Sequence, residues 1–176
     1  MAFDINKEKV FLFPMGPVSD ELLEWLINIF HETAGIKGVK EKQTRIPSGA
    51  YNKKREQYLG DALLEYIREM NHYMRGTLIG LINADCYAEG HNFIFGEAVL
   101  KGCQAIVALP RLRQSFYGLS ENPDLFRERV LKEILHELGH TWGFTHCPDP
   151  LCAMHFANSL CDIDVKNAHY CEHHGK

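Results

Sequence analysis

The sequence predicts an α/β domain built on a mixed, mostly parallel sheet. Short apolar runs that are typical of buried strands alternate along the chain with apolar stripes at helical spacing. Such an alternation packs helices against a sheet whose strands run mainly in one direction. The predicted order is β-α-β-α-β-β-β-α, followed by a small C-terminal part that is rich in cysteine.

The first half of the chain supplies two strands and two helices. An apolar run at residues 10–13 ends at Pro14, which suits a buried strand. Ser19 is suited to cap a helix whose apolar stripe continues to about residue 35. The next expected elements are a strand at 39–46, a loop at 48–58 and an amphipathic helix at 60–74.

The rest of the chain supplies three strands and one long helix. Phe93 and Phe95 alternate with other residues and indicate an edge strand before the loop at Gly96. Asn122 and Pro123 are a favourable helix start, with asparagine as the N-cap and proline at the first helical position. The other expected elements are a central strand at 77–82, a buried strand at 105–109 and a helix that continues from Pro123 to near Gly143.

Length and composition indicate one soluble domain. The chain has 176 residues, of which 24% are charged and 45% hydrophobic, with a net charge of −4. The negative charge argues against nucleic-acid partners, and no apolar run approaches the roughly 20 residues that a membrane span needs. We expect a single domain with an N-terminal subdomain at 1–143 and a small C-terminal subdomain at 144–176.

One run of residues carries the most specific chemical signal. From His136 to His146 it reads H-E-x-x-H-x-x-G-x-x-H, a zinc-binding pattern. His136 and His140 are four residues apart, so on a helix they share one face and reach one zinc ion. His146 requires the chain to turn back toward the metal. Gly143 is placed where that turn needs a residue that tolerates positive φ.

This pattern predicts a catalytic metal rather than a structural one. Three protein ligands leave the fourth position of the zinc ion open for water. Glu137 follows the first ligand, and its carboxylate reaches that zinc-bound water as a general base. The metal lowers the pKa of the water toward about 7 and polarises a substrate carbonyl. We expect hydrolysis of an acyl bond, most naturally a peptide bond.

Cysteine and histidine also concentrate in the last thirty residues, which favours a second, structural zinc site. Disulfides are the competing interpretation. The N-terminus lacks the pattern of a signal peptide, so we expect a cytoplasmic chain, and clustered cysteines in a reducing compartment more often bind metal. The six cysteines are Cys86, Cys103, Cys147, Cys152, Cys161 and Cys171.

These motifs together resemble the archaemetzincin family of zinc metallopeptidases. His146 is followed directly by Cys147, and then by Cys152 and Met154 in the family spacing C-x4-C-x-M. The resemblance implies a metzincin-like fold with an active-site helix and two zinc ions, one catalytic and one structural. It assigns Met154 to a turn beneath the histidines, a role that is mainly packing.

The family closes its second site with C-x-x-C, and this chain departs from that pattern. It has Cys171-Glu-His-His, so His174 stands where the family has its last cysteine. A site of three cysteines and one histidine suits zinc as well as a site of four cysteines does. The resemblance therefore implies Cys147, Cys152, Cys171 and His174 as ligands of the structural zinc, with Cys161 or His173 as alternatives for the fourth.

Segments further upstream extend the resemblance over most of the chain. They lie at residues 55–58, 92–98 and 105–113. In metzincins an antiparallel edge strand lines the upper rim of the cleft and pairs with extended substrate. The resemblance places that strand at 92–95, where an ordinary sheet edge is an equal alternative.

We therefore expect a zinc metallopeptidase that acts on peptides or proteins. The alternatives are a non-catalytic, zinc-stabilised peptide-binding module and an enzyme for non-peptide acyl substrates. Glu137 favours catalysis, because a binding module needs no base at that position. Other polar residues are assigned no catalytic role. Arg111 and Arg113 are expected to be solvated or paired rather than bound to a substrate carboxylate, and nothing in the spacing places Tyr170 near the metal. Cys86 and Cys103 are expected to be buried.

Overall fold

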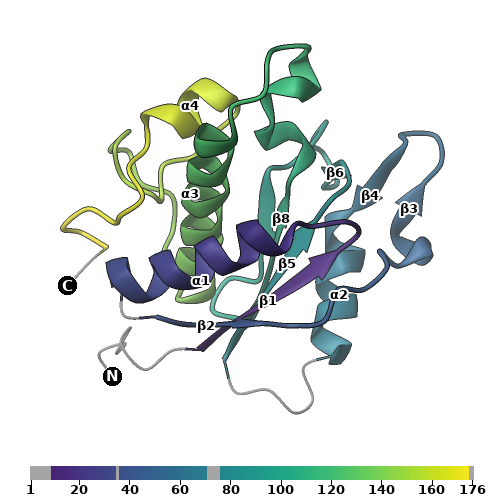
Figure 1. Ribbon diagram of the computed structural model, residues 1–176, viewed down its shortest axis with the longest axis horizontal. Coiled ribbons are helices and arrows are strands. Elements are labelled where there is room, and N and C mark those ends of the chain that lie inside the picture. The colour runs from purple at the N-terminus through teal and green to yellow at the C-terminus, as the bar shows by residue number, and fades with distance from the viewer. Residues whose placement is uncertain (1–8, 35, 71–75, 175–176) are drawn as a thin grey trace.

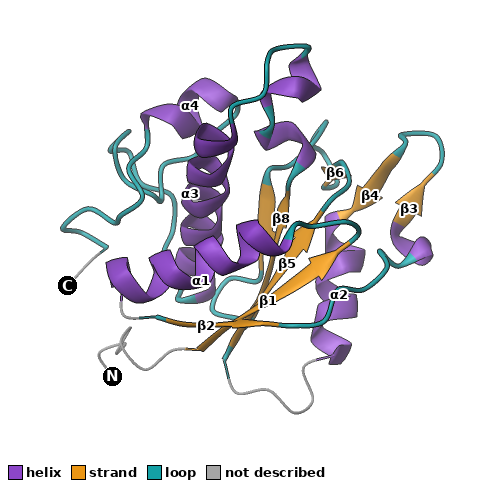
Figure 2. Ribbon diagram, viewed as in Figure 1, coloured by secondary structure: helices purple, strands orange, loops and turns teal. Residues whose placement is uncertain are grey.

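Five strands form the main sheet of the structure, a computed structural model that describes residues 9–34, 36–70 and 76–174. They are β1 (Lys9–Met15), β2 (Lys37–Lys40), β5 (Thr77–Ile82), β7 (Gly96–Ala98) and β8 (Gln104–Ala108). Their order is β2-β1-β5-β8-β7, and every neighbouring pair is parallel except β7 with β8. The predicted α/β class, with helices packed around a sheet (Figure 2), is confirmed, and so is an antiparallel strand at one edge.

Helices cover both faces of this sheet. They are α1 (Asp20–Ala34), α2 (Gly60–Met70), α3 (Pro123–Thr141) and the short α4 (Leu160–Val165). On one face Leu26 of α1 and Ile134 of α3 share a core with Ile79, and on the other Ile67 of α2 shares a core with Leu78 (Figure 1). Neighbouring residues of β5 thus serve opposite cores. None of these helices has the length and apolar character that a membrane span requires.

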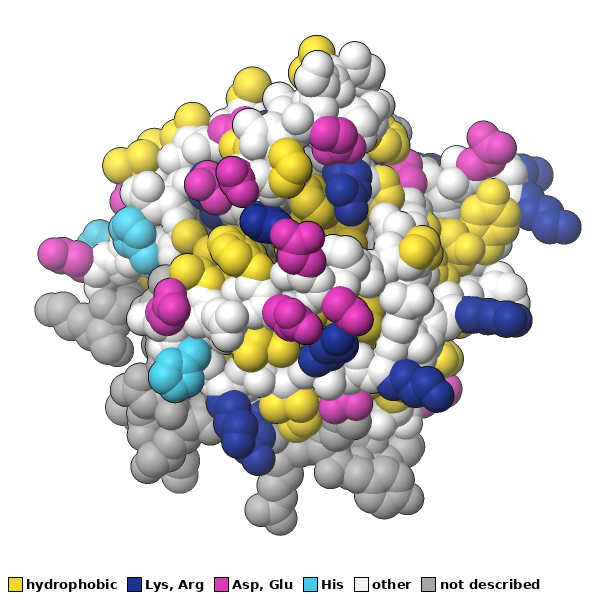
Figure 3. Space-filling view, in the orientation of Figure 1, with side chains coloured by type: hydrophobic (Ala, Val, Ile, Leu, Met, Phe, Trp, Pro, Cys, Tyr) yellow, Lys and Arg dark blue, Asp and Glu magenta, His cyan; other side chains and the backbone are white. Residues whose placement is uncertain are grey.

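A small second sheet projects beside α2. Its strands are β3 (Tyr51–Asn52), β4 (Gln57–Leu59) and β6 (Cys86–Tyr87), in that order. Figure 3 shows basic side chains gathered at the projecting β3–β4 hairpin, while acidic side chains spread over the middle of the same face of the molecule. Short 3-10 helices occupy Ser48–Ala50, Pro110–Leu112 and Gln114–Tyr117.

The structure corrects several predicted elements. Residues 48–58, expected to be a loop, contain the β3–β4 hairpin, and of residues 39–46 only the first two belong to a strand. Residues 92–95 form no strand, because the N–H of Ile94 donates to the carbonyl of Cys86 in the small sheet (3.0 Å) instead of to β8. The edge strand begins only at Gly96. The end of the predicted helix at 60–74 lies outside the described residues, and α4 was not predicted.

Candidate metal centres and the cleft beside the histidines

Helix α3 carries two of the three histidines of the motif. Its start follows the prediction: the side-chain oxygen of Asn122 accepts a hydrogen bond from the N–H of Leu125 (3.1 Å), and Pro123 occupies the first turn. One helical turn separates His136 from His140, so the two rings project from one face. Their Nε2 atoms lie 3.1 Å apart.

The third histidine reaches the same place through a tight turn. Gly143 has a φ of 93°, in the left-handed region that favours glycine, and its N–H donates to the carbonyl of His140 (2.9 Å). The turn brings His146 back toward the helix. One ring nitrogen from each of His136, His140 and His146 lies within 4.8 Å of the others.

The surroundings of these rings favour metal binding. Nδ1 of His136 donates to the carbonyl of Ala153 (2.8 Å) and Nδ1 of His140 to that of Phe144 (2.9 Å), which leaves each Nε2 with a free lone pair. Burial lowers the pKa of His136 to about 3 and also lowers the pKa of His140 and His146. Neutral imidazole is the form that binds metal. A tetrahedral zinc would hold its nitrogen ligands roughly 3.3 Å apart, so these residues fit it.

A cleft of about 680 Å³ opens in front of the three histidines. Helix α3 contributes Glu133 and Glu137 to its lining, and residues 90–98, which include β7, line it as well. Phe156 also lines the cleft, with its ring centroid 4.9 Å from that of His146. Glu137 is only 4% exposed, and burial together with the negative charge of Glu133 raises its pKa well above the usual value.

Polar side chains outside the cleft hold its rim in place, the rim being the segment at 91–95 that precedes β7. Nη2 of Arg55 donates to the carbonyls of His91 (2.9 Å) and Asn92 (3.0 Å). Nε2 of Gln57 donates to the same Asn92 carbonyl (3.0 Å). Because the rim segment lacks strand pairing at these residues, side chains of the hairpin supply the hydrogen bonds that a neighbouring strand would otherwise supply.

Arg111 also supports the rim, through its contact with Phe93. Its Nε and Nη2 donate to the two carboxylate oxygens of Asp85 (2.6 and 2.7 Å), and its guanidinium lies 4.3 Å from the ring centroid of Phe93 in the cleft wall. Of the two roles expected for Arg111, solvated or paired, the structure shows the paired one. Arg113 lies over the ring of Phe126 (3.9 Å).

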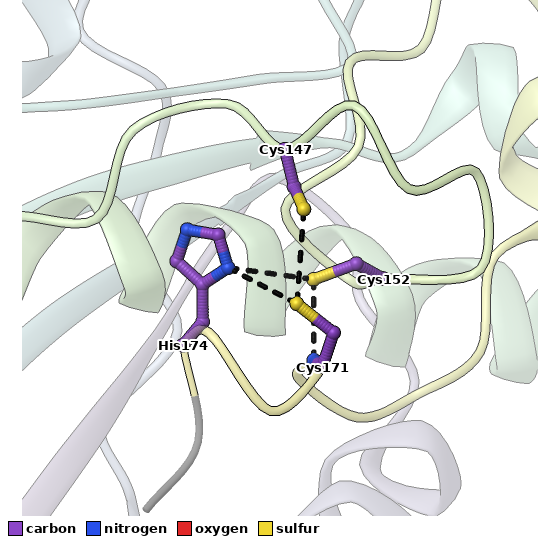
Figure 4. Close-up of side chains that lie close together, drawn as sticks. All are labelled: Cys147, Cys152, Cys171 and His174. Carbon is purple, nitrogen blue, oxygen red and sulfur yellow. Dashed lines mark hydrogen bonds between the residues drawn. The ribbon is translucent and has the colours of Figure 1, made fainter.

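The cysteine-rich part brings a second group of possible ligands together. One ligand atom from each of its four members lies within 4.8 Å of the others. Figure 4 shows the side chains converging on one point: two come from the loop after His146 and two from the C-terminal turn. The members are Cys147, Cys152, Cys171 and His174.

The distances in this group suit a metal and not a disulfide. The sulfurs of Cys147 and Cys171 are 3.7 Å apart, far beyond the roughly 2.05 Å of a disulfide and close to the roughly 3.8 Å between thiolates on one zinc. Nδ1 of His174 lies 3.4 Å from the sulfur of Cys171 and 3.9 Å from that of Cys152. Hydrogen bonding to His174 lowers the pKa of Cys171 to about 6, toward the thiolate form.

Other cysteines and histidines lie outside both groups. Cys161 is exposed on α4, and His173 is exposed beside His174, so neither alternative fourth ligand joins the second group. Cys86 is buried as expected, but Cys103 is exposed, which corrects the prediction. Cys103 lies just before β8, outside the sheet core.

Comparison with known proteins decides the family. The model of peptidase family M54 matches residues 1–175. Archaemetzincin of Methanocaldococcus jannaschii is 38% identical over 93% of this chain and 89% of its own length, and that of Methanopyrus kandleri 45% identical over 80% and 76%. The chain belongs to the archaemetzincin family. The resemblance drawn from the motifs is confirmed.

Solved archaemetzincins share the fold as well. The crystal structure from Methanopyrus kandleri superimposes with a TM-score of 0.81 at 36% identity, covering 98% of this chain and 94% of its own. The archaemetzincin of Archaeoglobus fulgidus, complexed with malonate, gives a TM-score of 0.80 at 30% identity, covering 94% and 96%. The archaemetzincin fold therefore extends over nearly the whole chain.

The methionine of the archaemetzincin motif packs against helix α3. Met154 is fully buried, and a Cβ at Gly139 of α3 would lie 2.2 Å from its sulfur. The backbone carbonyl of Met154 also accepts a bond from the N–H of Cys147 (2.9 Å). Tyr170 donates its hydroxyl to the carbonyl of Leu135 (2.6 Å), consistent with a packing role.

Sequence reasoning missed the charged residues that join α3 to the C-terminal part. Nζ of Lys166 lies 2.7 Å from Oε1 of Glu133, with both side chains enclosed. The guanidinium of Arg129 makes two 2.6 Å bonds to the carboxylate of Asp164. Nothing in the sequence distinguishes these charges from those of a solvated helix face, and only the docking of α4 on α3 brings them together.

Proposed function

We propose that this archaemetzincin is a metzincin-type zinc metallopeptidase that hydrolyses peptide bonds. The observation that best supports this is the convergence of three imidazoles, those of His136, His140 and His146, in the cleft that Glu137 also lines. In this proposal the histidines hold the catalytic zinc and Glu137 is the general base.

Zinc, when bound, supplies a Lewis acid that polarises the scissile carbonyl and lowers the pKa of the attacking water. The carboxylate of Glu137 takes one proton from that water and later delivers it to the amine nitrogen of the leaving group. The buried position of Glu137 supports this role, because burial raises the pKa of its carboxyl group and so makes the carboxylate a stronger proton acceptor.

Strand β7 offers the substrate a backbone to pair with. The N–H of Ala108 donates to the carbonyl of Phe95 (2.8 Å), and the N–H of Val99 to that of Gln104 (3.1 Å). In an antiparallel ladder the residues between these hydrogen-bonded positions point their N–H and C=O groups away from the partner strand. Gly96 and Ala98 therefore direct backbone groups toward the open edge, where an extended peptide would add as a strand.

Glu137→Gln tests the catalytic proposal, because glutamine preserves the size of the side chain and cannot take the proton. Wild type and variant, both loaded with zinc, are incubated with a peptide library and with small amides and esters, and products are identified by mass spectrometry. We expect peptide cleavage by wild type and a loss of roughly 10²-fold or more in the variant. Equal cleavage by both would remove Glu137 as the base. Peptide binding without cleavage by either would favour a binding module.

We also propose a second, structural zinc on Cys147, Cys152, Cys171 and His174, which closes a small C-terminal subdomain at 144–176 onto the N-terminal one at 1–143. The convergence of three thiols and one imidazole supports it. Four protein ligands leave no open position, which is the arrangement of structural zinc sites.

Elemental mass spectrometry of protein purified without added metal tests both sites together. We expect about two zinc ions per wild-type chain, and about one in each of His140→Ala and Cys152→Ser. Cys147→Ser is expected to lower the content of both sites, because Cys147 adjoins His146. One zinc in wild type, lost only in Cys152→Ser, would mean that the histidine site does not retain metal.

A further inference from the structure

Gly96 on the edge strand lies directly against the side chain of Glu137. A Cβ built at Gly96 would stand 2.4 Å from Oε1 of Glu137, 2.8 Å from its Cγ and 2.9 Å from its Cδ. The φ of Gly96 is outside the left-handed region, so its backbone would accept any residue. What requires glycine here is the space that Glu137 occupies.

Packing, rather than hydrogen bonding, holds Glu137 in this position. Among the residues that the structure describes, none forms a hydrogen bond or ion pair with its carboxylate, although the side chain is 4% exposed. Its neighbours His136 and His140 are held differently, because the carbonyls of Ala153 and Phe144 orient their rings. The position of the Glu137 carboxylate therefore depends on the surfaces it touches, and Gly96 is one of them.

We propose that Gly96 is a positioning residue for the general base: its missing side chain lets the carboxylate of Glu137 lie against the strand on which the substrate pairs. This inference rests on the proposed role of Glu137. Gly96 thus links the strand on which the substrate pairs with the general base. It directs its own N–H and C=O toward the substrate, and its lack of a side chain sets how closely Glu137 approaches that strand.

The geometry fixes the size of the expected effect. Ordinary contact between a Cβ and another heavy atom begins at 3.4 Å, so alanine at position 96 displaces Oε1 of Glu137 by about 1 Å. A misplacement of that size in a catalytic group costs roughly 10²-fold in rate. We expect Gly96→Ala to lower kcat by roughly that factor, with little change in KM and with zinc content equal to that of wild type.

A compensating variant separates this effect from a general disturbance of the strand. Glu137→Asp shortens the base by one methylene group, so aspartate has room beside alanine at position 96. We expect Glu137→Asp to cost a smaller factor in kcat in the Gly96→Ala background than in wild type. Gly49→Ala is the matched control, because a Cβ there meets nothing within 4 Å, and its kcat should equal that of wild type.

The proposal would be overturned if Gly96→Ala kept the kcat of wild type, or if Glu137→Asp lowered kcat by the same factor in both backgrounds. A rise in KM of Gly96→Ala with unchanged kcat would mean that the methyl group only obstructs substrate, and would also overturn it. A crystal structure of Gly96→Ala gives a readout independent of activity. If wild type cleaves no peptide, the proposed function fails by itself. The crystal structure then still decides whether alanine displaces Glu137, as inferred, or leaves it in place, which would refute the inference.

Discussion

Lys166 forms an enclosed ion pair with Glu133 of helix α3, and replacing Lys166 with methionine would break it. Nζ of Lys166 lies 2.7 Å from Oε1 of Glu133, and the two side chains are 0% and 4% exposed. Methionine keeps much of the apolar stem of lysine but leaves the carboxylate buried without its counter-ion. Removing one partner of such a pair costs about 3–5 kcal/mol in the free energy of unfolding.

This loss is large enough to measure as a melting temperature. In a domain of this size each kcal/mol lowers Tm by roughly 2–4 °C, so Lys166→Met should melt roughly 6–20 °C below wild type. Thermal and urea unfolding are followed at a fixed excess of zinc, since bound metal adds to stability. Lys40→Met is the matched control: its Nζ is also 2.7 Å from a carboxylate, that of Asp20, but the two side chains are 36% and 75% exposed. That variant should lose no more than about 1 kcal/mol.

The double variant Lys166→Met with Glu133→Leu distinguishes a broken charge pair from lost packing. An apolar pair in place of a buried ion pair is often neutral or stabilising, so the double variant should recover most of the stability that Lys166→Met loses. The reasoning is refuted if Lys166→Met is no less stable than Lys40→Met. It is also refuted if the double variant unfolds at the same temperature as the single one.

Two further predictions concern the cleft wall. Burial raises the pKa of Glu97 to about 7 from its usual 4.5. Between pH 4.5 and 7 the folded chain therefore keeps a proton that the unfolded chain releases, so the stability of the fold falls as pH rises through this range. Glu97→Gln should therefore gain stability over wild type from pH 4.5 to 7 in urea titrations and keep a constant gain above; a pH-independent difference would contradict this. Arg111→Lys keeps the charge but loses the paired bonds and the flat contact with Phe93, so peptide hydrolysis should show a several-fold higher KM with unchanged zinc content. An unchanged KM would show that the rim needs no such support.

The centre of the fold follows from local sequence signals, and the edges do not. The strands β5 and β8 are apolar runs buried on both faces, and α3 has its own cap and apolar stripe, so each is specified by its own residues. In the rim, aromatic residues alternate with others at 92–95 as they do in a strand, and Phe95 does pack into the core. The backbone of the rim is nevertheless bonded by Arg55 and Gln57, two side chains that lie far away in the sequence.

The two ligand groups also differ in how far the sequence predicted them. His136, His140 and His146 are brought together by one helix and one turn, so their spacing alone predicted their convergence. The fourth member of the second group depends on how the C-terminal turn folds back, and spacing left three candidates open. The structure places His174 with the cysteines, while Cys161 projects from a helix that the sequence did not predict.

The second ligand group also influences the first, through His146, which is the histidine of the first group that α3 does not carry. His136 and His140 each donate Nδ1 to a carbonyl, which orients the ring before any metal binds. The ring of His146 has no such hydrogen bond to a described residue, so its direction depends on its contact with the ring of Phe156 and on the backbone that carries it. That backbone continues into Cys147, whose N–H is bonded to the carbonyl of Met154 and whose thiol belongs to the second group. A metal on the second group would therefore hold the loop that presents His146, and this is why we expect Cys147→Ser to weaken both sites.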